Sequence, residues 1–242
     1  MVHRPVPKTA LVLAGGKGER LRPLTDNRPK PMVELAGAPI LVHHLRWLRR
    51  NGIERAILLT GYLHEEVEAY FVVPRIEGLT VTCVSEDRPL GRGGVLKNGF
   101  VQAGIPDQVV VATNGDVLTD QSLGELFELH VQSNALVTLM LTRMASPYGT
   151  VDVDDDGMVS RFNDRPVLPY WINAGVYRID TSVFAQFPDE GDHETTTFPL
   201  LADDGRLVGL RSRSQSMSVE SADDLRRVGE WLATGLHPSG SQ

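Results

Sequence analysis

The sequence is poor in cysteine and in long apolar runs. Its 242 residues include one cysteine, Cys83, which excludes a disulfide framework or a cysteine zinc site within one chain. We expect Cys83, in the strand-like segment 79–84, to be a buried and inert thiol. No apolar run reaches the roughly 18 residues of a membrane-spanning helix, and the first residues lack a signal-peptide segment. The expected location is therefore the cytoplasm, without a membrane partner.

Positive charge is also in deficit. Lys and Arg number 24 against 31 Asp and Glu, a net charge of −7, which argues against nucleic acid as a partner. A hydrophobic content of 41% and a charged content of 23% are typical of a globular protein with a substantial core. Without repeats or a clear linker, we expect one compact domain over residues 1–242, with a disordered tail at 237–242.

Basic residues nevertheless gather near the N-terminus. Residues 10–13 form a short apolar run that suits a buried parallel strand. Three glycines follow, whose backbone can adopt positive φ and present N–H groups to an anion: Gly15, Gly16 and Gly18. Cationic side chains accompany the loop: Lys17, Arg20, Arg22 and, fixed between two prolines, Lys30. This stretch predicts a polyphosphate site.

The loop differs from two common phosphate-binding patterns. No Gly-Lys-Ser/Thr follows it, so the Walker pattern is absent. The third glycine of a dinucleotide fingerprint is not at its proper offset, so an NAD-binding domain fits poorly. A glycine-rich loop after a strand is by itself equally compatible with a tight β–α turn.

The longer string is far more specific. Leu-Ala-Gly-Gly-x-Gly-x-Arg-Leu-x-Pro-Leu-Thr, residues 13–25, with a trailing Pro-Lys-Pro, resembles the signature of the sugar-1-phosphate nucleotidyltransferases. The resemblance implies that Arg20 binds the triphosphate and that Lys30 stabilises charge on the transferring phosphate. It assigns nucleotide binding to the loop residues Leu13, Ala14, Gly15, Gly16, Lys17 and Gly18. Glu19 departs from the family's usual small Thr or Ser.

The first half of the chain alternates strands and helices. Strands are expected at 56–59, 81–84 and 109–113, and helices at 39–50, 64–71 and 93–103. This order predicts an α/β fold with a mostly parallel, Rossmann-like sheet and helices on both faces. Ligands bind beyond the carboxyl ends of such strands, where the glycine loop, Glu86 and Asp116 fall.

A less regular, β-rich lobe is expected from about residue 136. Strands at 136–143 and 172–179 flank a predicted hairpin of 148–153 with 158–162. A capping box, Ser221-x-x-Asp224, opens a last helix over 221–234. We therefore divide the chain into a nucleotide-binding part (about 8–135), a sugar-phosphate part (about 136–220) and this C-terminal helix.

Asp116 is the candidate metal ligand. It follows an apolar strand directly after Gly115, and a hard cation such as Mg²⁺ binds carboxylate and triphosphate oxygens together. An isolated Gly-Asp is more often a turn, but the resemblance places a metal-binding Asp here. We assign the neighbouring Asn114 to nucleotide binding.

Glu86 is the candidate reader of the base. A carboxylate accepts the two donors of guanine, whereas a pyrimidine with one donor suits Gln better. The segment Glu86-x-x-Pro-Leu-Gly91-x-Gly-Gly, with Gly91 as a second nucleotide contact, resembles the guanylyltransferase branch acting on mannose and heptose 1-phosphates. GTP is therefore favoured, with UTP or dTTP as the alternative.

Three further segments resemble the family's sugar site. Phe-Asn-Asp-Arg-Pro, residues 162–166, matches Phe-x-Glu-Lys-Pro, which gives Asp164 for the sugar-contacting acid and Arg165 for the phosphate-binding lysine. Arginine offers a planar fork where lysine offers a point charge. Asn173 matches the residue that hydrogen-bonds sugar hydroxyls, and Gly149 a backbone contact to the sugar.

One position departs from the family. Ser218 stands where the family usually has a second metal-binding Asp, and Ser is a poor Mg²⁺ ligand. Glu220 shares its face if this piece is extended, so it is the candidate substitute. The sequence predicts transfer of a nucleotide from GTP to a sugar 1-phosphate with Mg²⁺. A non-catalytic nucleotide-sugar sensor stays open because of Ser218, and a homodimer is compatible with the sequence.

Overall fold

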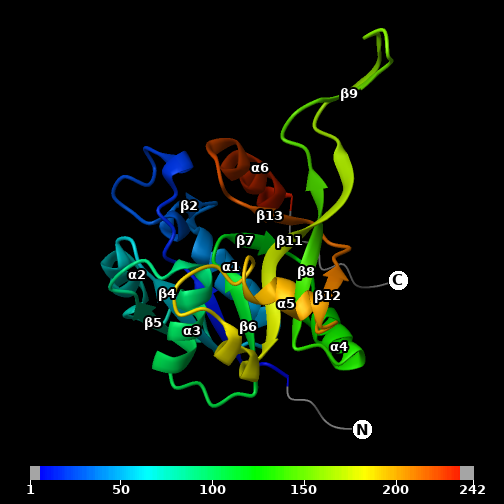
Figure 1. Ribbon diagram of the computed structural model, residues 1–242. Coiled ribbons are helices and arrows are strands. Elements are labelled where there is room, and N and C mark those ends of the chain that lie inside the picture. Colours follow the sequence, from blue (N-terminus) through cyan, green and yellow to red (C-terminus); the bar gives the residue numbers. More distant parts are fainter. Residues whose placement is uncertain (1–5, 235–242) are drawn as a thin grey trace.

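A seven-stranded sheet forms the centre of the protein, in the strand order β12-β8-β11-β6-β1-β4-β5. The computed structural model describes residues 6–234 (Figure 1). Four strands of the first half run parallel: β1 (Thr9–Leu13), β4 (Arg55–Thr60), β5 (Thr80–Ser85) and β6 (Val109–Asn114). Three strands of the second half complete the sheet: β8 (Val137–Ala145), β11 (Val167–Asp180) and β12 (Leu207–Arg211). β11 is antiparallel to both β6 and β8, and the predicted mostly parallel sheet is confirmed.

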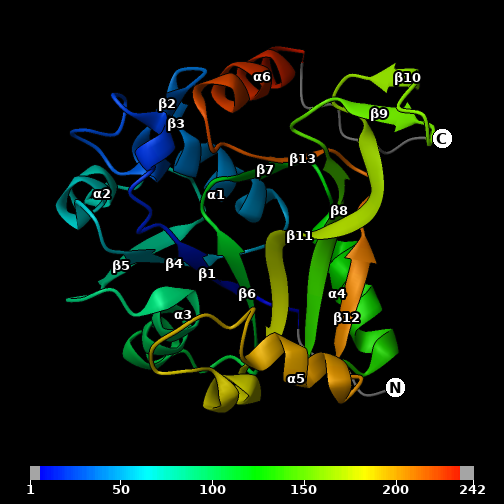
Figure 2. The ribbon, with the colours of Figure 1, turned by 45° about the horizontal axis from the view of Figure 1, so that its top comes forward.

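Helices cover both faces of the sheet, as predicted (Figure 2). One face packs against α1 (Ile40–Arg50), α2 (His64–Phe71) and α4 (Leu123–Ser133). The other packs against α3 (Gly91–Gln102), α5 (Thr197–Asp203) and the 3₁₀ helix η3 (Thr181–Gln186). Within β1, Ala10 and Val12 enter the first core and Leu11 the second, because successive side chains of a strand point to opposite faces. This double burial explains the unbroken apolar runs in the sequence.

The helix α1, predicted over 39–50, carries a row of leucines on one face. Leu41, Leu45 and Leu48 are completely buried on its inner face. The helix ends at Arg50 with Asn51 as its C-cap, and Gly52 follows with a φ of 87° and donates its N–H to the carbonyl of Arg49. Glycine accepts this conformation without a Cβ penalty, which suits it to the end of a helix.

A two-stranded arm projects from the sheet between β8 and β11 (Figures 1 and 2). It consists of β9 (Thr150–Val153) and β10 (Val159–Asn163), paired antiparallel as the sequence predicts. Asp154 closes the turn because its Oδ1 accepts the N–H groups of Asp156 and Met158. Residues 136–220 thus extend the main sheet as well as forming the arm, and their separation as a sugar-binding part stays a prediction.

Short strand pairs and a last helix place the C-terminal segment beside the residues that follow β6. β13 (Ser216–Ser218) pairs with β7 (Val117–Thr119), and β2 (Glu34–Leu35) pairs with β3 (Ala38–Pro39). α6 (Ala222–Ala233) begins at the predicted cap, where Ser221 Oγ accepts the N–H of Asp224. Val228 of α6 packs on a small core that includes Leu21 of the 3₁₀ helix η1 (Glu19–Leu21). The C-terminal segment therefore reaches the glycine loop.

Several elements were not predicted, and one prediction lies outside the described residues. The helices α4 and α5, the strand β12 and the short strands were not predicted from the sequence. The short strands have only two or three residues, whereas α4 carries Leu123, Leu126 and Phe127 at helical spacing, a signal that could have identified it. The predicted disordered tail at 237–242 lies beyond residue 234. Within residues 6–234, none of the helices has the length and apolarity needed to cross a membrane.

Candidate active site

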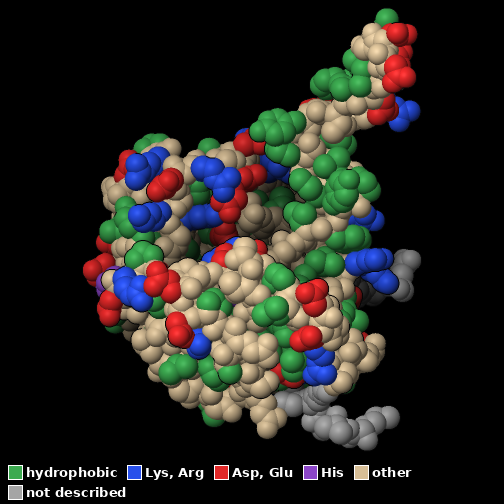
Figure 3. Space-filling model, viewed as in Figure 1, with side chains coloured by type: hydrophobic (Ala, Val, Ile, Leu, Met, Phe, Trp, Pro, Cys, Tyr) green, Lys and Arg blue, Asp and Glu red, His purple; other side chains and the backbone are tan. Residues whose placement is uncertain are grey.

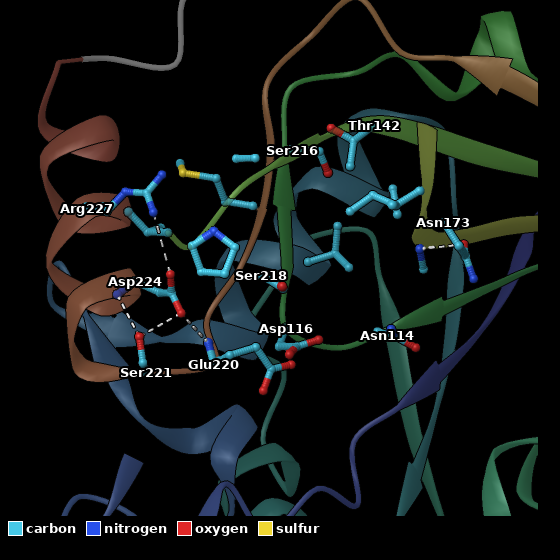
Figure 4. A pocket seen from close by; sticks show the side chains of 18 of the residues that line it. Asn114, Asp116, Thr142, Asn173, Ser216, Ser218, Glu220, Ser221, Asp224 and Arg227 are labelled. Atoms are coloured by element: carbon cyan, nitrogen blue, oxygen red, sulfur yellow. Dashed lines mark hydrogen bonds and ion pairs between the residues drawn. The ribbon is translucent and has the colours of Figure 1, made fainter. Parts of the chain in front are cut away.

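A cavity of about 850 Å³ opens beyond the carboxyl end of β6 and beside the middle of β11, at the base of the arm (Figures 3 and 4). Its volume falls in the range of small-molecule sites. Of the residues predicted to be catalytic, ligand-binding or metal-binding, six line it: Arg20, Asn114, Asp116, Arg165, Asn173 and Glu220. The opposite wall comes from β13 and the start of α6. The cavity thus unites residues that are up to 200 positions apart in sequence.

The glycine loop folds back on the segment that carries Lys30. Gly18 has a φ of 65°, and a Cβ there would lie 2.8 Å from the Lys30 Cβ and 2.9 Å from a Thr25 methyl group. Thr25 Oγ1 donates to the Gly18 carbonyl at 2.8 Å, and the Lys30 N–H donates to the Gly16 carbonyl at 3.1 Å. Only glycine fits this close approach, so the loop and the Pro-Lys-Pro segment form one structural unit.

Lys30 lies between two carboxylates. Its Nζ is 2.6 Å from Asp116 Oδ2 and 2.8 Å from Glu220 Oε1, and its side chain is 11% exposed. Arg20 Nη2 contacts the other oxygen of Glu220 at 2.6 Å, with a side chain that is 72% exposed. A buried ammonium needs such partners, because removing one would leave an uncompensated charge. The structure therefore brings together the three predicted catalytic residues and Glu220.

Glu220, rather than Ser218, reaches the charged cluster. Ser218 is paired with Val117 in the β13–β7 ladder and is exposed. Glu220, two residues later, turns its carboxylate toward Asp116, as Figure 4 shows. Its backbone N–H donates to Asp224 Oδ2 at 3.2 Å, which ties it to the start of α6. Among residues 6–234 no cluster of three or more His, Cys, Asp or Glu could hold a metal ion, and metal binding by Asp116 and Glu220 stays a prediction.

The remaining predicted nucleotide residues lie outside the lining of this cavity, at the ends of β1, β4 and β5. A Cβ on Gly15 would lie 3.1 Å from the nitrogen of Gly61, and one on Gly61 would lie 2.8 Å from Glu86 Oε1. Glu86 Oε2 accepts the N–H of Leu90 at 2.8 Å. Gly91, with a φ of 73°, packs against the carbonyl of Gly191. The glycine loop and Glu86 are thus neighbours, and their binding of a nucleotide stays a prediction.

The other end of the cavity carries a polar network around Asn173. Asn173 Nδ2 donates to Tyr177 Oη at 2.7 Å and to Glu194 Oε1 at 2.9 Å. Arg92 of α3 donates to both oxygens of Glu194, at 2.8 and 3.0 Å. Arg92 and Glu194 line the cavity but were not predicted from the sequence. No local motif indicates them, because the contact joins residues 102 positions apart.

The predicted arm residues are only partly brought into the site. Arg165 lines the cavity and donates to Asp223 Oδ2 at 3.2 Å. Hydrogen bonds from Arg226 and then Arg165 hold the pKa of Asp223 below its usual value. Asp164 is exposed and lies outside the cavity lining. Gly149 lies against Phe162, whose ring a Cβ would approach to 2.6 Å, also outside the lining. The sugar contacts expected of Asp164 and Gly149 stay predictions.

Two fully buried histidines lie behind the cavity walls. His44 of α1 bonds through Nδ1 to the carbonyl of Val117 at 2.7 Å, while burial lowers its pKa to about 4. His193 stacks on Phe187 and meets the edge of Tyr177, and burial lowers its pKa to about 4 as well. Both are therefore neutral at pH 7 and serve as core residues.

Proteins of known structure share this fold. The crystal structure of HddC from Yersinia pseudotuberculosis superposes with a TM-score of 0.75 at 23% identity, covering 93% of this chain and 99% of that one. A UDP-glucose pyrophosphorylase complexed with UDP-glucose gives a TM-score of 0.74 at 16% identity, covering 95% and 99%. At such low identity these likenesses show the fold.

Sequence relatives are more similar. Mannose-1-phosphate guanylyltransferase of Mycobacterium tuberculosis is 37% identical over 238 residues, covering 95% of this chain and 66% of the relative. D-glycero-alpha-D-manno-heptose 1-phosphate guanylyltransferase of Aneurinibacillus thermoaerophilus is 37% identical over 179 residues, covering 72% and 76%. UTP–glucose-1-phosphate uridylyltransferase of Synechocystis is 31% identical over 217 residues, covering 81% and 55%. The chain thus spans about half to three quarters of these relatives.

The resemblance seen in the glycine loop and the Pro-Lys-Pro segment extends over nearly the whole chain. The model of the nucleotidyl transferase family matches residues 9–237. Its match includes the segments that supply Asp116 and Glu220 to the cavity and Lys30, which bonds to both. The chain therefore belongs to the nucleotidyl transferase family.

Proposed function

We propose that the protein transfers a nucleotide from a nucleoside triphosphate, GTP by preference, to a sugar 1-phosphate of the mannose or heptose type. The observation that carries the proposal is the Lys30 ammonium held between Asp116 and Glu220, directly behind the glycine loop. The names of two relatives, a mannose-1-phosphate and a heptose 1-phosphate guanylyltransferase, support the substrate class. The Glu86 carboxylate supports guanine, while the uridylyltransferase relative keeps UTP as the alternative.

The proposed reaction is an in-line displacement at the α-phosphorus. A phosphate oxygen of the sugar 1-phosphate attacks, the bond between the α-phosphorus and the bridging oxygen breaks, and pyrophosphate leaves with that bond's electron pair. Arg20 would hold the leaving pyrophosphate, Lys30 the α-phosphate and Arg165 the incoming phosphate. Each exchanges a carboxylate partner (Glu220, Asp116 or Asp223) for phosphate oxygens. Catalysis is then positioning and charge neutralisation.

Members of this family generally use a divalent metal ion, and the residues present fit one. Asp116 and Glu220 approach the same ammonium from two separate chain segments, which gives two hard oxygen donors. Phosphate oxygens and water complete the coordination that Mg²⁺ prefers. We therefore propose that these two carboxylates hold Mg²⁺, which would neutralise charge on the triphosphate when bound.

The test is release of pyrophosphate with Mg²⁺, each of GTP, UTP, dTTP and ATP, and mannose, glucose or heptose 1-phosphate. The expected result is release with GTP and a mannose-type or heptose phosphate. Nucleotide binding without release for any pair would contradict the proposal.

The second candidate function is a nucleotide-sugar sensor, which Ser218 favours. Replacing Glu220 by Ala should abolish Mg²⁺-dependent turnover, and adding Ser218→Asp to that variant should restore part of it. The sensor would be favoured if the wild-type protein binds nucleotide without releasing pyrophosphate and the Ser218→Asp variant releases it. Location in the cytoplasm and assembly as a homodimer remain predictions of the sequence.

A further inference from the structure

In the polar network around Asn173, some hydrogen-bonding groups already have all their partners and others do not. The Asn173 amide has two N–H donors, one directed to Tyr177 Oη and the other to Glu194 Oε1. Its Oδ1 accepts the backbone N–H of Gly175 at 2.9 Å. Asn173 therefore has no N–H left to donate to a ligand while this arrangement holds.

Unlike Asn173, Glu194 can still form a hydrogen bond to a ligand, as an acceptor. Its Oε1 accepts from Asn173, from Tyr177 Oη at 3.1 Å and from Arg92. Its Oε2 accepts from Arg92 alone among the described residues, which leaves lone-pair capacity on that oxygen. The Glu194 side chain is 28% exposed and lines the cavity.

Arg92 and Tyr177 hold the Glu194 carboxylate in one orientation. The guanidinium of Arg92 meets both oxygens of Glu194 and, through Nε, Oδ2 of Asp192 at 2.7 Å. This forked, charge-assisted contact fixes the plane of a carboxylate. Burial first, and the nearby Glu194 charge further, raise the pKa of Tyr177, so its hydroxyl stays a neutral donor. The carboxylate is thus a preorganised acceptor for hydroxyl groups.

We propose that Glu194 is the specificity-determining acceptor for the hydroxyl groups of the sugar, and that Arg92 and Asn173 act as its positioning residues. The inference rests on the proposed function, because it takes the ligand at this end to be a sugar 1-phosphate. A carboxylate whose orientation is fixed selects a sugar that presents a free hydroxyl donor, and preferably two adjacent ones, away from its phosphate. It discriminates against deoxy sugars, because the bound sugar would cover this acceptor and leave it without a partner.

The test compares wild type with Glu194→Gln by calorimetric titration in the presence of GTP and Ca²⁺. The probe is whichever of mannose, glucose and heptose 1-phosphate binds wild type most tightly, together with its monodeoxy analogues. Wild type should lose about tenfold or more in affinity for one deoxy analogue. Glu194→Gln should bind the parent sugar phosphate about 10- to 100-fold more weakly and lose its sensitivity to that same deoxygenation.

Asp192→Asn is the matched control. Asp192 also binds Arg92 but is absent from the cavity lining, so this variant perturbs the same guanidinium without removing the acceptor. It should keep the full deoxy sensitivity, and GTP affinity should be unchanged in both variants. Equal deoxy sensitivity in wild type and Glu194→Gln would overturn the inference, as would failure of all three sugar phosphates to bind. Sugar binding that depends on Glu194 without pyrophosphate release would instead contradict the proposed function alone.

Discussion

The two ends of the cavity hold their charges in different ways. At the phosphate end, Arg20 and Lys30 share the carboxylate of Glu220, Lys30 also meets Asp116, and Arg20 is largely exposed. At the sugar end, the guanidinium of Arg92 is held by two carboxylates, and Asn173 and Tyr177 also donate to one of them, Glu194. Among the described residues, Arg20 contacts a carboxylate through one nitrogen, whereas Arg92 does so through all three of its side-chain nitrogens.

This difference matches the chemistry of the ligands proposed for each end. Phosphates carry their own charge, so a cation such as Arg20, which is exposed and contacts one carboxylate, can exchange partners when a triphosphate arrives. Hydroxyl groups carry no charge and bind well only to acceptors that are already oriented. The phosphate end is thus built for exchange and the sugar end for preorganisation.

Removal of Lys30 from the phosphate end should have the largest effect on turnover. Lys30→Ala should raise the activation free energy by about 2.7–4 kcal/mol and so lower kcat, because one donor to the transition state is lost. The measurement is steady-state pyrophosphate release with saturating substrates. Lys8→Ala is the control, because Lys8 forms an exposed pair with Glu54 and should leave the rate unchanged. An unchanged rate in Lys30→Ala would remove Lys30 from the mechanism.

Lowering the pH should reduce the free energy of unfolding, because two buried histidines lie in the core next to the cavity. His44 and His193 have folded-state pKa values of about 4, below the ordinary 6.5, so the unfolded chain takes up protons first. The free energy of unfolding should therefore be unaffected by these groups above pH 6.5 and fall between pH 6.5 and 4, by about 3 kcal/mol for each histidine. Urea unfolding followed across this range measures the slope.

The histidine contribution can be separated by substitution. His193→Phe keeps a ring against Phe187 but cannot titrate, so it should flatten the loss of stability below pH 6.5. His64, a surface residue whose pKa Glu68 raises, is the control. Because His64 stabilises the fold when protonated, His64→Asn should steepen the loss or leave it unchanged. An equal slope in wild type and His193→Phe would show that His193 is not neutral in the fold.

Substitution of Glu86 tests whether the site for the base is preorganised like the sugar end. It has the smallest expected effect. Glu86→Gln should lower the ratio of kcat/KM for GTP over UTP by about tenfold, because one donor of guanine loses a charged acceptor. Asp87→Asn removes an exposed neighbouring acid and should leave the ratio unchanged. A ratio that does not move in Glu86→Gln would mean that the base is read elsewhere.

Much of the fold was determined by local sequence pattern. The apolar runs at 10–13, 56–59 and 109–113 became the buried strands β1, β4 and β6, because a strand covered on both faces must be apolar throughout. The leucines of α1, the Asp154 turn and the Ser221 cap also act within a few residues, so sequence alone identifies them. The glycine loop and the Pro-Lys-Pro segment indicated a phosphate site by the same local chemistry.

Tertiary structure alone decided which charges meet. Glu220 reaches Lys30 because β13 pairs with β7, and neither strand is long enough to leave a periodic signal. Arg92 meets Glu194 because α3 and the segment before α5 cover the same face of the sheet. Such contacts join residues 100 or more positions apart, and their pairing depends on strand order rather than on the residues between them. The sequence by itself therefore determined most of the long strands and helices and predicted a phosphate site in the glycine loop, and the sheet decided which residues meet in the cavity.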